Sequence, residues 1–226
     1  MELPWAHPSH VQPLACIGRQ APLALYLSDV DSPRRPALEA FIQARFAEQH
    51  GASVRHFMPC LLGLEDSAGT LLAAVGLRSG ASGPLFLERY LSQPVETALS
   101  GQPARAQLVE VGNLAANSPG AARLLIVALT DLLVALGFRW VTFTGTTSLL
   151  NSFQRLGLSP LPLGLADPQC MGEELADWGS YYDCAPQVMA GDIYSGHQRL
   201  LHLGAYARLG HQALYAPEEM LDVACR

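Results

Sequence analysis

The sequence predicts an α/β fold of the α+β type, in which helices flank a mixed central sheet and a helical extension follows. The 226 residues are 50% hydrophobic and only 15% charged, which is enough apolar material for a sizeable core. Apolar runs with strand and helix periodicity alternate between residues 107 and 165, as expected for a parallel or mixed sheet covered by helices. At about 150 residues per domain, the length fits one large domain with an appendage.

The first half of the chain is expected to place several strands around one long helix. Leu38, Phe41, Ile42 and Phe46 recur at helical spacing, and Gly51 follows as a stop signal. The expected elements, in order, are an irregular lead-in over 1–22, a strand over 23–27, a helix over 34–50, paired strands over 54–64 and 70–77, and short helical pieces over 85–91 and 94–99.

The second half alternates between strands and helices. Pro119 in the first turn and Gly137 at the end delimit a strongly apolar helix. The expected elements are strands over 107–116, 138–144 and 161–165, helices over 119–137 and 149–156, a loop-like stretch over 166–196 with a strand near 187–190, and a helix over 197–215 broken near Gly204 or Gly210. We expect one domain over 23–192 and a helical extension over 193–226, packed on that domain or on a partner subunit.

Composition excludes several classes of function. All 14 basic residues are arginine, which excludes a Schiff-base lysine, a lysine general base and a P-loop lysine. The net charge of −6 argues against a nucleic-acid partner. Five scattered cysteines without a CxxC pair, and no signal-peptide pattern, favour reduced thiols in the cytoplasm. No metal site is expected, because His197 and His202 lack acidic neighbours in the sequence.

The informative segment is 107–158. A strand carrying Glu110 leads into a turn of small residues over 115–122 and then into a helix. We expect the mixed sheet to splay open after this strand, with the turn facing the gap. Such a turn offers backbone N–H groups and the positive end of a helix dipole to an anion such as a pyrophosphate. The signatures GxSxG, HExxH, GxGxxG and the Walker loop are all absent, so common hydrolase and nucleotide-binding functions lose their support.

This combination resembles the GNAT acyltransferase fold, and within it the thermostable hemolysin family, relatives of the acyl-homoserine lactone synthases. The resemblance covers roughly residues 34–192 and implies a GNAT-like mixed sheet. It rests on six segments in order, namely 85–91, 109–115, 143–146, 156–158, 166–168 and 178–182. It implies transfer of an acyl chain from a thioester of coenzyme A or of an acyl carrier protein to a small-molecule amine.

The chain also departs from the superfamily pattern. The Gln/Arg-x-x-Gly-x-Gly/Ala pyrophosphate loop is absent, and Pro119 removes one N–H from the turn that replaces it. Phe153 stands where many members have a tyrosine that protonates the departing thiolate. Asn113 replaces the arginine of the Glu-x-x-Arg element found in the lactone synthases.

The expected catalytic residues are Glu110 and Asn113. A buried strand position raises the pKa of Glu110 toward the range of a general base, and Asn113 orients the acceptor amine or the thioester carbonyl. The residues expected to hold the phosphopantetheine arm of the donor are Leu114, Ala115, Ala116, Gly120, Ala121, Ala122, Arg123, Thr144 and Asn151, with Arg123 as the cation nearest the phosphate. Those expected to bind substrate are Arg78, Glu88, Arg89, Tyr90, Trp178 and Tyr182.

Ordinary structural roles compete with each of these assignments. Glu110 also fits an ion pair with an arginine, Asn113 fits a turn, and the 88–90 segment fits the polar face of a short helix. The function expected is an N-acyltransferase with Glu110 as base. Two alternatives remain, a membrane-active haemolysin-like protein using the amphipathic tail, and an acyl-thioester-binding fold without catalysis. Membrane contact is not favoured, and the sequence predicts neither the acyl chain length nor the oligomeric state.

Overall fold

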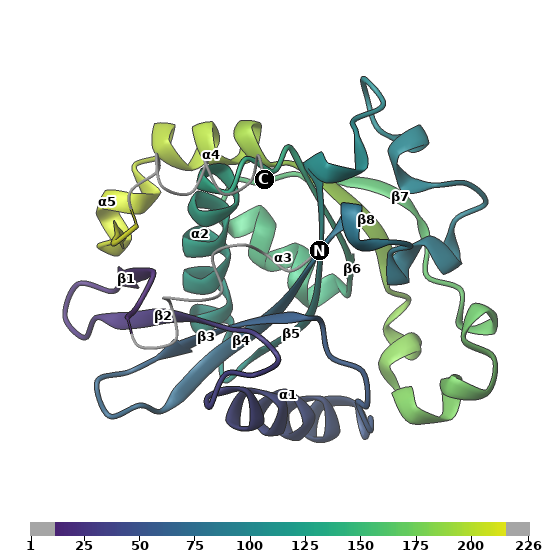
Figure 1. Cartoon of the computed structure of the whole chain (residues 1–226), viewed down its shortest axis with the longest axis horizontal. Helices are drawn as coiled ribbons and strands as arrows, with labels where there is room; N and C mark the ends of the chain where they lie inside the picture. The colour runs from purple at the N-terminus through teal and green to yellow at the C-terminus, as the bar shows by residue number, and fades with distance from the viewer. Residues whose placement is uncertain (1–11, 216–226) are drawn as a thin grey trace.

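A computed structural model describes residues 12–215, so the parts of the expected lead-in and extension over 1–11 and 216–226 lie outside the described residues. The strands form one mixed sheet in the order β7-β8-β6-β5-β4-β3-β2-β1-β9, in which β5 and β6 are parallel and the other neighbours antiparallel (Figure 1). The strands are β1 (Ala15–Ile17), β2 (Leu23–Ser28), β3 (Cys60–Glu65), β4 (Leu71–Ser79), β5 (Leu108–Ala116), β6 (Trp140–Gly145), β7 (Leu161–Leu165), β8 (Gln187–Asp192) and β9 (Gln212–Ala213).

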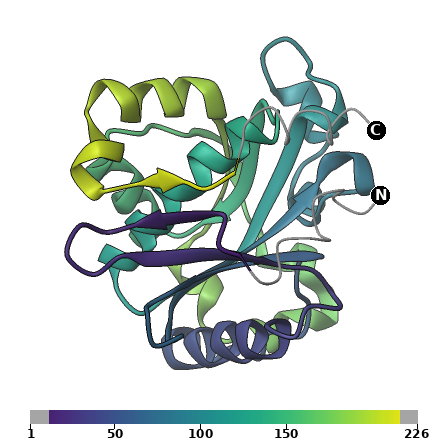
Figure 2. The same cartoon turned by 60° about the vertical axis from the view of Figure 1, so that its left-hand side comes forward.

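Helices cover both faces of this sheet, as expected. In Figure 2, α1 lies below the sheet, and α2 and α4 lie above it. Leu38 and Ile42 of α1 are buried with Leu61 of β3, whereas Leu125 and Leu132 of α2 belong to the larger core on the opposite face. The α-helices are α1 (Arg35–His50), α2 (Pro119–Ala135), α3 (Thr147–Arg155), α4 (Ile193–His202) and α5 (Ala205–Leu209). The 3₁₀ segments used below are η2 (Phe86–Tyr90), η3 (Val95–Ala98), η5 (Pro168–Trp178) and η6 (Tyr181–Cys184).

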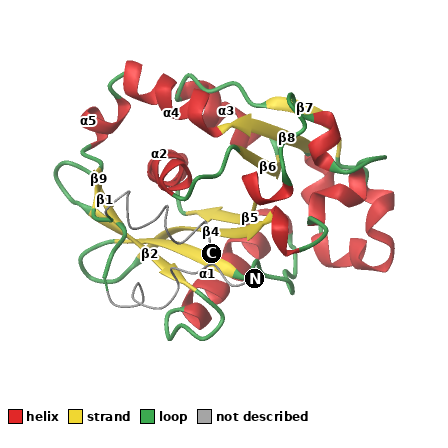
Figure 3. Cartoon of the chain, turned by 45° about the horizontal axis from the view of Figure 1, so that its top comes forward, coloured by secondary structure: helices red, strands yellow, loops and turns green. Residues whose placement is uncertain are grey.

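The sheet opens between β5 and β6. These strands pair only from Leu108 to Val111 on β5, although β5 continues to Ala116. Beyond the last pair, Asn113 has a φ of 52°, and the register with β4 shifts between Ala74 and Gly76, so β5 bulges where it leaves β6. Figure 3 views α2 almost end-on beside the diverging strands. The expected splay after the Glu110 strand is therefore confirmed.

The strand expected over 54–64 begins only at Cys60, so its first half was predicted wrongly. Side chains take the hydrogen bonds that a neighbouring strand would otherwise supply. The Arg35 guanidinium donates to the carbonyl oxygens of Met58 and Pro59 at 2.9 and 2.8 Å. Asn113 Oδ1 accepts from the Met58 N–H at 2.9 Å. The apolar pattern here therefore reflects packing of a loop.

Both ends of the described chain join the main sheet. The lead-in is not irregular throughout, because β1 (Ala15–Ile17) pairs with β2. The tail helix begins at Ile193 and not at residue 197, and left-handed Gly204 and Gly210 separate α4, α5 and β9. Because β9 pairs with β1 at the edge of the sheet, the described part of the extension packs on its own domain.

A half-buried polar cluster attaches this tail to α2. Tyr215 Oη donates to Asp131 Oδ2 at 2.6 Å, and His197 Nδ1 lies 2.8 Å from Tyr206 Oη and 3.6 Å from Asp131 Oδ1. His211 Nε2 lies 3.8 Å from Asp131 Oδ2, and the His211 ring packs beside that of Tyr206 with 5.2 Å between centroids. Burial lowers the pKa of His211, although the charge of Asp131 opposes the shift.

The segment over 168–184, which contains η5 and η6, docks on the end of α1. The Ser180 N–H donates to His50 O at 2.8 Å, and the Ser53 N–H donates to Asp177 O at 2.6 Å. Gly179 makes this contact possible, because a Cβ there would lie 2.1 Å from the carbonyl oxygen of His50. Within the described residues, no helix is both long and apolar enough to cross a membrane.

Stability should fall on mild acidification, and His211 should account for part of the fall. Since the folded-state pKa of His211 lies below its usual 6.5, the unfolded chain binds this proton more tightly, so the free energy of unfolding decreases as pH drops below about 6.5. His211→Phe keeps an aromatic ring and removes the titration, so the slope should become shallower. The slope should not vanish, because burial also lowers the pKa of His50.

Denaturant unfolding between about pH 5 and 8 measures this dependence of stability on pH. The exposed His202 provides the control, and an equal effect of His202→Phe would contradict the assignment.

Docking of 168–184 should depend on the missing Cβ at Gly179. Gly172 and Gly179 share one backbone conformation, with φ, ψ of 54°, −129° and 52°, −128°. Substitution by alanine would impose the same backbone strain at both positions. Only at Gly179 would the new Cβ meet another atom within 4 Å. Gly179→Ala should therefore lower Tm more than Gly172→Ala and should expose 168–184 to proteolysis. Equal effects of the two substitutions would show that strain alone matters.

Candidate functional site

One cavity of about 460 Å³ follows the opening of the sheet. Its mouth lies between the end of α1 and the 168–184 segment, its middle passes the diverging ends of β5 and β6, and its inner end lies against α2 and α3. The volume is within the usual range for small-molecule sites, about 300–1,000 Å³. The splay of the sheet thus creates a space that is continuous from one face to the other.

Aromatic rings crowd the mouth of the cavity. Trp178 lies between Phe86, Tyr181 and Tyr182, with centroid separations of 6.0, 5.3 and 6.0 Å. The hydroxyls of Tyr90 and Tyr182 are 2.6 Å apart. These residues come from η2, η5 and η6, so the mouth is assembled from segments that are far apart in the sequence.

The inner end is largely apolar, although Thr130, Ser148 and Ser152 also line it. It is lined by side chains of α2, β6 and α3, namely Leu125, Ile126, Leu129, Leu133, Val141, Phe143, Leu149 and Phe153. Phe153 stacks on Phe143 with 5.1 Å between ring centroids and 23° between planes. This surface accommodates hydrocarbon, and Phe153 brings no hydroxyl to it.

Glu110 stands between the aromatic mouth and the apolar end. Its side chain lines the cavity, yet only 2% of the residue is exposed. One carboxylate oxygen accepts from the Phe86 N–H at 2.9 Å and the other from the Leu87 N–H at 2.8 Å. Burial raises the pKa of Glu110 above its usual value, although these hydrogen bonds and the charge of Arg78 oppose the shift. The predicted direction of the shift is therefore confirmed.

Arg78 faces Glu110 across the β4–β5 ladder and also lines the cavity. Arg45 and Arg55, the other arginines in the lining, form ion pairs with Glu48 and Asp177. Within residues 12–215, Arg78 has no ion pair with a carboxylate closer than 4 Å. The alternative of a structural ion pair between Glu110 and an arginine is thus not realised, and the Arg78 guanidinium is available to a ligand.

Asn113 lines the cavity, but both polar atoms of its side chain already have hydrogen-bond partners in the protein. Its amide oxygen accepts from the Met58 N–H, and its amide nitrogen donates to His56 O at 3.1 Å. The structure therefore gives Asn113 a role in holding the β5 bulge against the loop before β3.

The residues expected to hold the donor divide into two groups. Leu114, Ala115, Ala116, Ala122 and Thr144 line the cavity, whereas Gly120, Ala121, Arg123 and Asn151 lie outside its lining. The first turn of α2 also has few N–H groups left for a ligand, because the Ala121 N–H donates to Ser118 Oγ at 3.1 Å and Pro119 has no N–H. Arg45, Arg55 and Arg78 line the cavity, whereas Arg123, expected nearest the phosphate, does not.

The residues expected to bind substrate divide similarly. Arg78, Tyr90, Trp178 and Tyr182 line the cavity, and Glu88 and Arg89 do not. Arg89 pairs with Glu174 at 3.1 Å and lies over the Phe86 ring. Phe46, His50 and Phe86, which are not among the expected site residues, also line the mouth, as does Tyr181 beside the expected Trp178 and Tyr182. In the sequence, Phe46 shows only the spacing of the buried face of a helix. Phe86 and Tyr181 could have been found from their positions close to Tyr90 and Tyr182.

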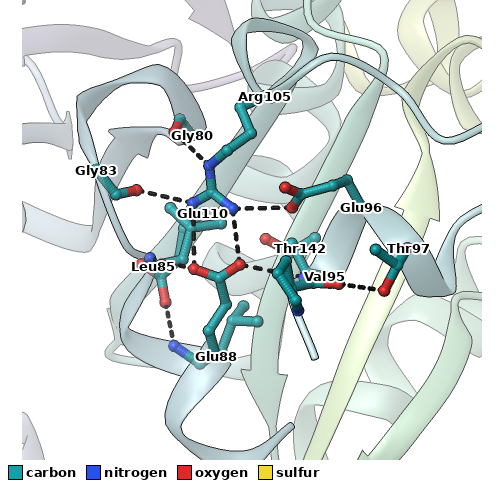
Figure 4. A network of polar contacts seen from close by, with 12 residues as sticks. Gly80, Gly83, Leu85, Glu88, Val95, Glu96, Thr97, Arg105, Glu110 and Thr142 are labelled. Carbon is teal, nitrogen blue, oxygen red and sulfur yellow. Dashed lines mark hydrogen bonds and ion pairs between the residues drawn. The ribbon is translucent and has the colours of Figure 1, made fainter. Parts of the chain in front are cut away.

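Glu88 belongs to a structural network next to the site (Figure 4). Arg105 donates to Glu88 at 2.7 Å, to Glu96 at 2.8 Å and to Gly83 O at 2.7 Å. Glu88 also accepts from the Leu85 and Val95 N–H groups. The network fixes the turn that presents the Phe86 and Leu87 N–H groups to Glu110. Among the described residues, no group of three or more metal-binding side chains is found.

Solved structures with a similar fold share little sequence with this chain. FeeM, an N-acyl amino acid synthase from uncultured soil microbes, is 15% identical with a TM-score of 0.55, over 81% of this chain and 97% of that one. BjaI, a CoA-dependent acyl-homoserine lactone synthase in complex with MTA, is 17% identical with a TM-score of 0.55, over 83% and 90%. The lactone synthase LasI is 11% identical with a TM-score of 0.53, over 76% and 90%.

These similarities establish the fold, a mixed sheet flanked by helices, as the sequence predicted. No curated protein sequence matches the chain. Residues 28–197, about three quarters of the chain, match the family described as thermostable hemolysin. The chain therefore belongs to the thermostable hemolysin family.

Proposed function

We propose that the protein is an N-acyltransferase that moves a fatty-acyl or related chain from a pantetheine thioester to an amine. The observation that carries the proposal is the single cavity that joins a polar, aromatic mouth to an apolar end, with the buried Glu110 carboxylate between them. An acyl chain matches the apolar end, and a small polar acceptor matches the mouth. The similar folds of FeeM and BjaI, both acyl-transferring synthases by name, support this function.

The residues of the cavity fit the pantetheine arm better than they fit the phosphates of a donor. Beyond Val111, β5 has no strand on the side facing β6, and Thr144 lies on the opposite wall. Backbone groups along this edge are suited to the amides of the arm. A pyrophosphate finds few partners here, because the first turn of α2 has few free N–H groups and Arg123 lies outside the cavity lining. The arm is common to coenzyme A and acyl carrier protein, so either donor is compatible with the site. BjaI is itself described with isopentyl-CoA.

In the proposed step, the amine nitrogen attacks the thioester carbonyl carbon. A C–N bond forms, the C–S bond breaks, and the electron pair of that bond leaves with the sulfur. Glu110 accepts the proton released from nitrogen, through a lone pair not used by the Phe86 and Leu87 N–H groups. Because Phe153 carries no hydroxyl, solvent protonates the departing thiolate.

The acceptor we propose carries a carboxylate as well as an amine. Arg78 is the cavity-lining arginine without a carboxylate partner among the described residues, and a guanidinium fork suits a carboxylate. With Arg78 opposite Glu110 on the next strand, a carboxylate on Arg78 would leave a nearby amine within reach of Glu110. FeeM is by name an N-acyl amino acid synthase, which supports the same class of acceptor.

Release of free thiol tests the proposed function. The purified protein is incubated with acyl-CoA or with an acyl-loaded carrier protein, with and without a mixture of amino acids, and products are identified by mass spectrometry. Amine-dependent thiol release with an N-acylated product is expected, and the faster donor identifies the carrier. Thioester binding without turnover would favour the non-catalytic alternative. Leakage of liposomes without any thioester would favour the membrane-active one.

Glu110→Gln should lower kcat by about 10²-fold or more, within the range of about 10²–10⁴ that a positioned general base contributes. In the native protein, kcat/KM should rise with pH as Glu110 ionises above its usual 4.5 and then reach a plateau, and this limb should be lost in the variant. Glu88→Gln is the matched control, because Glu88 supports the same turn but does not line the cavity. It should reduce stability and retain the pH limb. A decrease in kcat of less than about threefold in Glu110→Gln would leave solvent as the base.

A further inference from the structure

A second cavity of about 240 Å³ lies behind the inner end of the first. The two cavities have five lining residues in common, namely Thr130, Leu133, Val141, Phe143 and Phe153. These side chains therefore lie between the two spaces. The second cavity continues between α3 and α4 to Leu158, Ile193 and Gly196.

The stacked Phe143–Phe153 pair is the centre of this partition. Phe153 comes from α3 and Phe143 from β6, and each ring touches both spaces. Phe153 is only half-buried, which agrees with open space on its flanks. The two rings thus stand where any passage between the two cavities would run.

The far wall of the second cavity is held in place by the tail. Gly196 lies in the middle of α4, and its neighbour His197 joins the polar cluster around Asp131 of α2. The missing side chain of Gly196 leaves space next to Leu158, because a Cβ there would meet Leu158 Cδ2 at 3.6 Å, an ordinary contact. Most of the surface around this space is apolar, although Asp192 and Arg199 also reach its lining. The apolar part is suited to hydrocarbon.

We infer that the second cavity receives the distal end of a long acyl chain and that the Phe143–Phe153 pair sets the length above which it is used. This inference rests on the proposed function, because it extends the acyl end of the same site. Short chains end in front of the stacked rings. Longer chains pass between these rings and Leu133 and end beside Gly196 under α4. Phe153 is then a residue that determines chain length, in the position where other members of the superfamily have a proton donor.

Equilibrium binding of S-acyl pantetheines of increasing chain length tests this inference without requiring turnover. Each methylene that leaves water should strengthen binding by about fourfold, which corresponds to about 0.8 kcal/mol. In Gly196→Leu, the new side chain fills the second cavity, so the ratio of long-chain to short-chain affinity should fall at least tenfold. In Phe153→Ala, the passage widens, and the same ratio should rise at least tenfold.

Gln198→Leu is the matched control. Gln198 lies exposed on the same helix and outside both cavities, so an added leucine there should leave the length profile unchanged. Thermal unfolding checks that each variant is folded, and the two informative variants act on different elements, α3 and α4. If acyl pantetheines bind but neither variant changes the length profile, the second cavity is not an acyl site and the proposed function stands. If no acyl pantetheine of any length binds, both are overturned.

Discussion

The early end of the pairing between β5 and β6 is the constraint on which the site depends. The two strands are joined only from Leu108 to Val111, and the β5 bulge at Asn113 turns the rest of the strand away. The bulge persists because the Asn113 side chain is hydrogen-bonded to the backbone of His56 and Met58. An asparagine tolerates the left-handed conformation that this bend requires. Without the bend, β6 would continue along β5 and close the space in which the cavity lies.

Glu110 sits at the last paired stretch of β5, and its chemistry follows from that place. The backbone N–H groups of Phe86 and Leu87 make a buried carboxylate tolerable, because each oxygen has a partner. Desolvation still favours the protonated form. The Arg105–Glu88–Glu96 network fixes the turn that supplies these N–H groups. Glu110 therefore anchors η2 to the sheet and also presents a carboxylate of raised pKa to the cavity, and substitutions must be interpreted with both roles in view.

Segments outside the central strands complete the two ends of the cavity. The aromatic mouth forms when 168–184 docks on the end of α1, a contact that allows no side chain at Gly179. At the opposite end, α4 covers the space beside α3, and the cluster around Asp131 attaches α4 to α2. Because β9 also pairs with β1, the tail is integrated into the domain at two places. The shape of the site is thus a property of the whole described chain.

The sequence by itself determined the order and type of most elements, because hydrophobic periodicity and Gly or Pro boundaries are local signals. It also indicated the splay, the buried Glu110 and the aromatic segment around Trp178, since each follows from the pattern of one stretch. Tertiary structure alone decided which side chains meet. The sequence pattern of the loop before Cys60 is that of a strand, but Arg35 and Asn113 take its hydrogen bonds. β1 is a strand because it pairs with β2, and β9 is a strand because it pairs with β1. The sequence suggested Glu88 and Arg123 as site residues, but the folded chain pairs Glu88 with Arg105 and leaves Arg123 outside the lining of the cavity. Such partners are separated by tens of residues, and no local pattern encodes a contact that only the folded chain brings together.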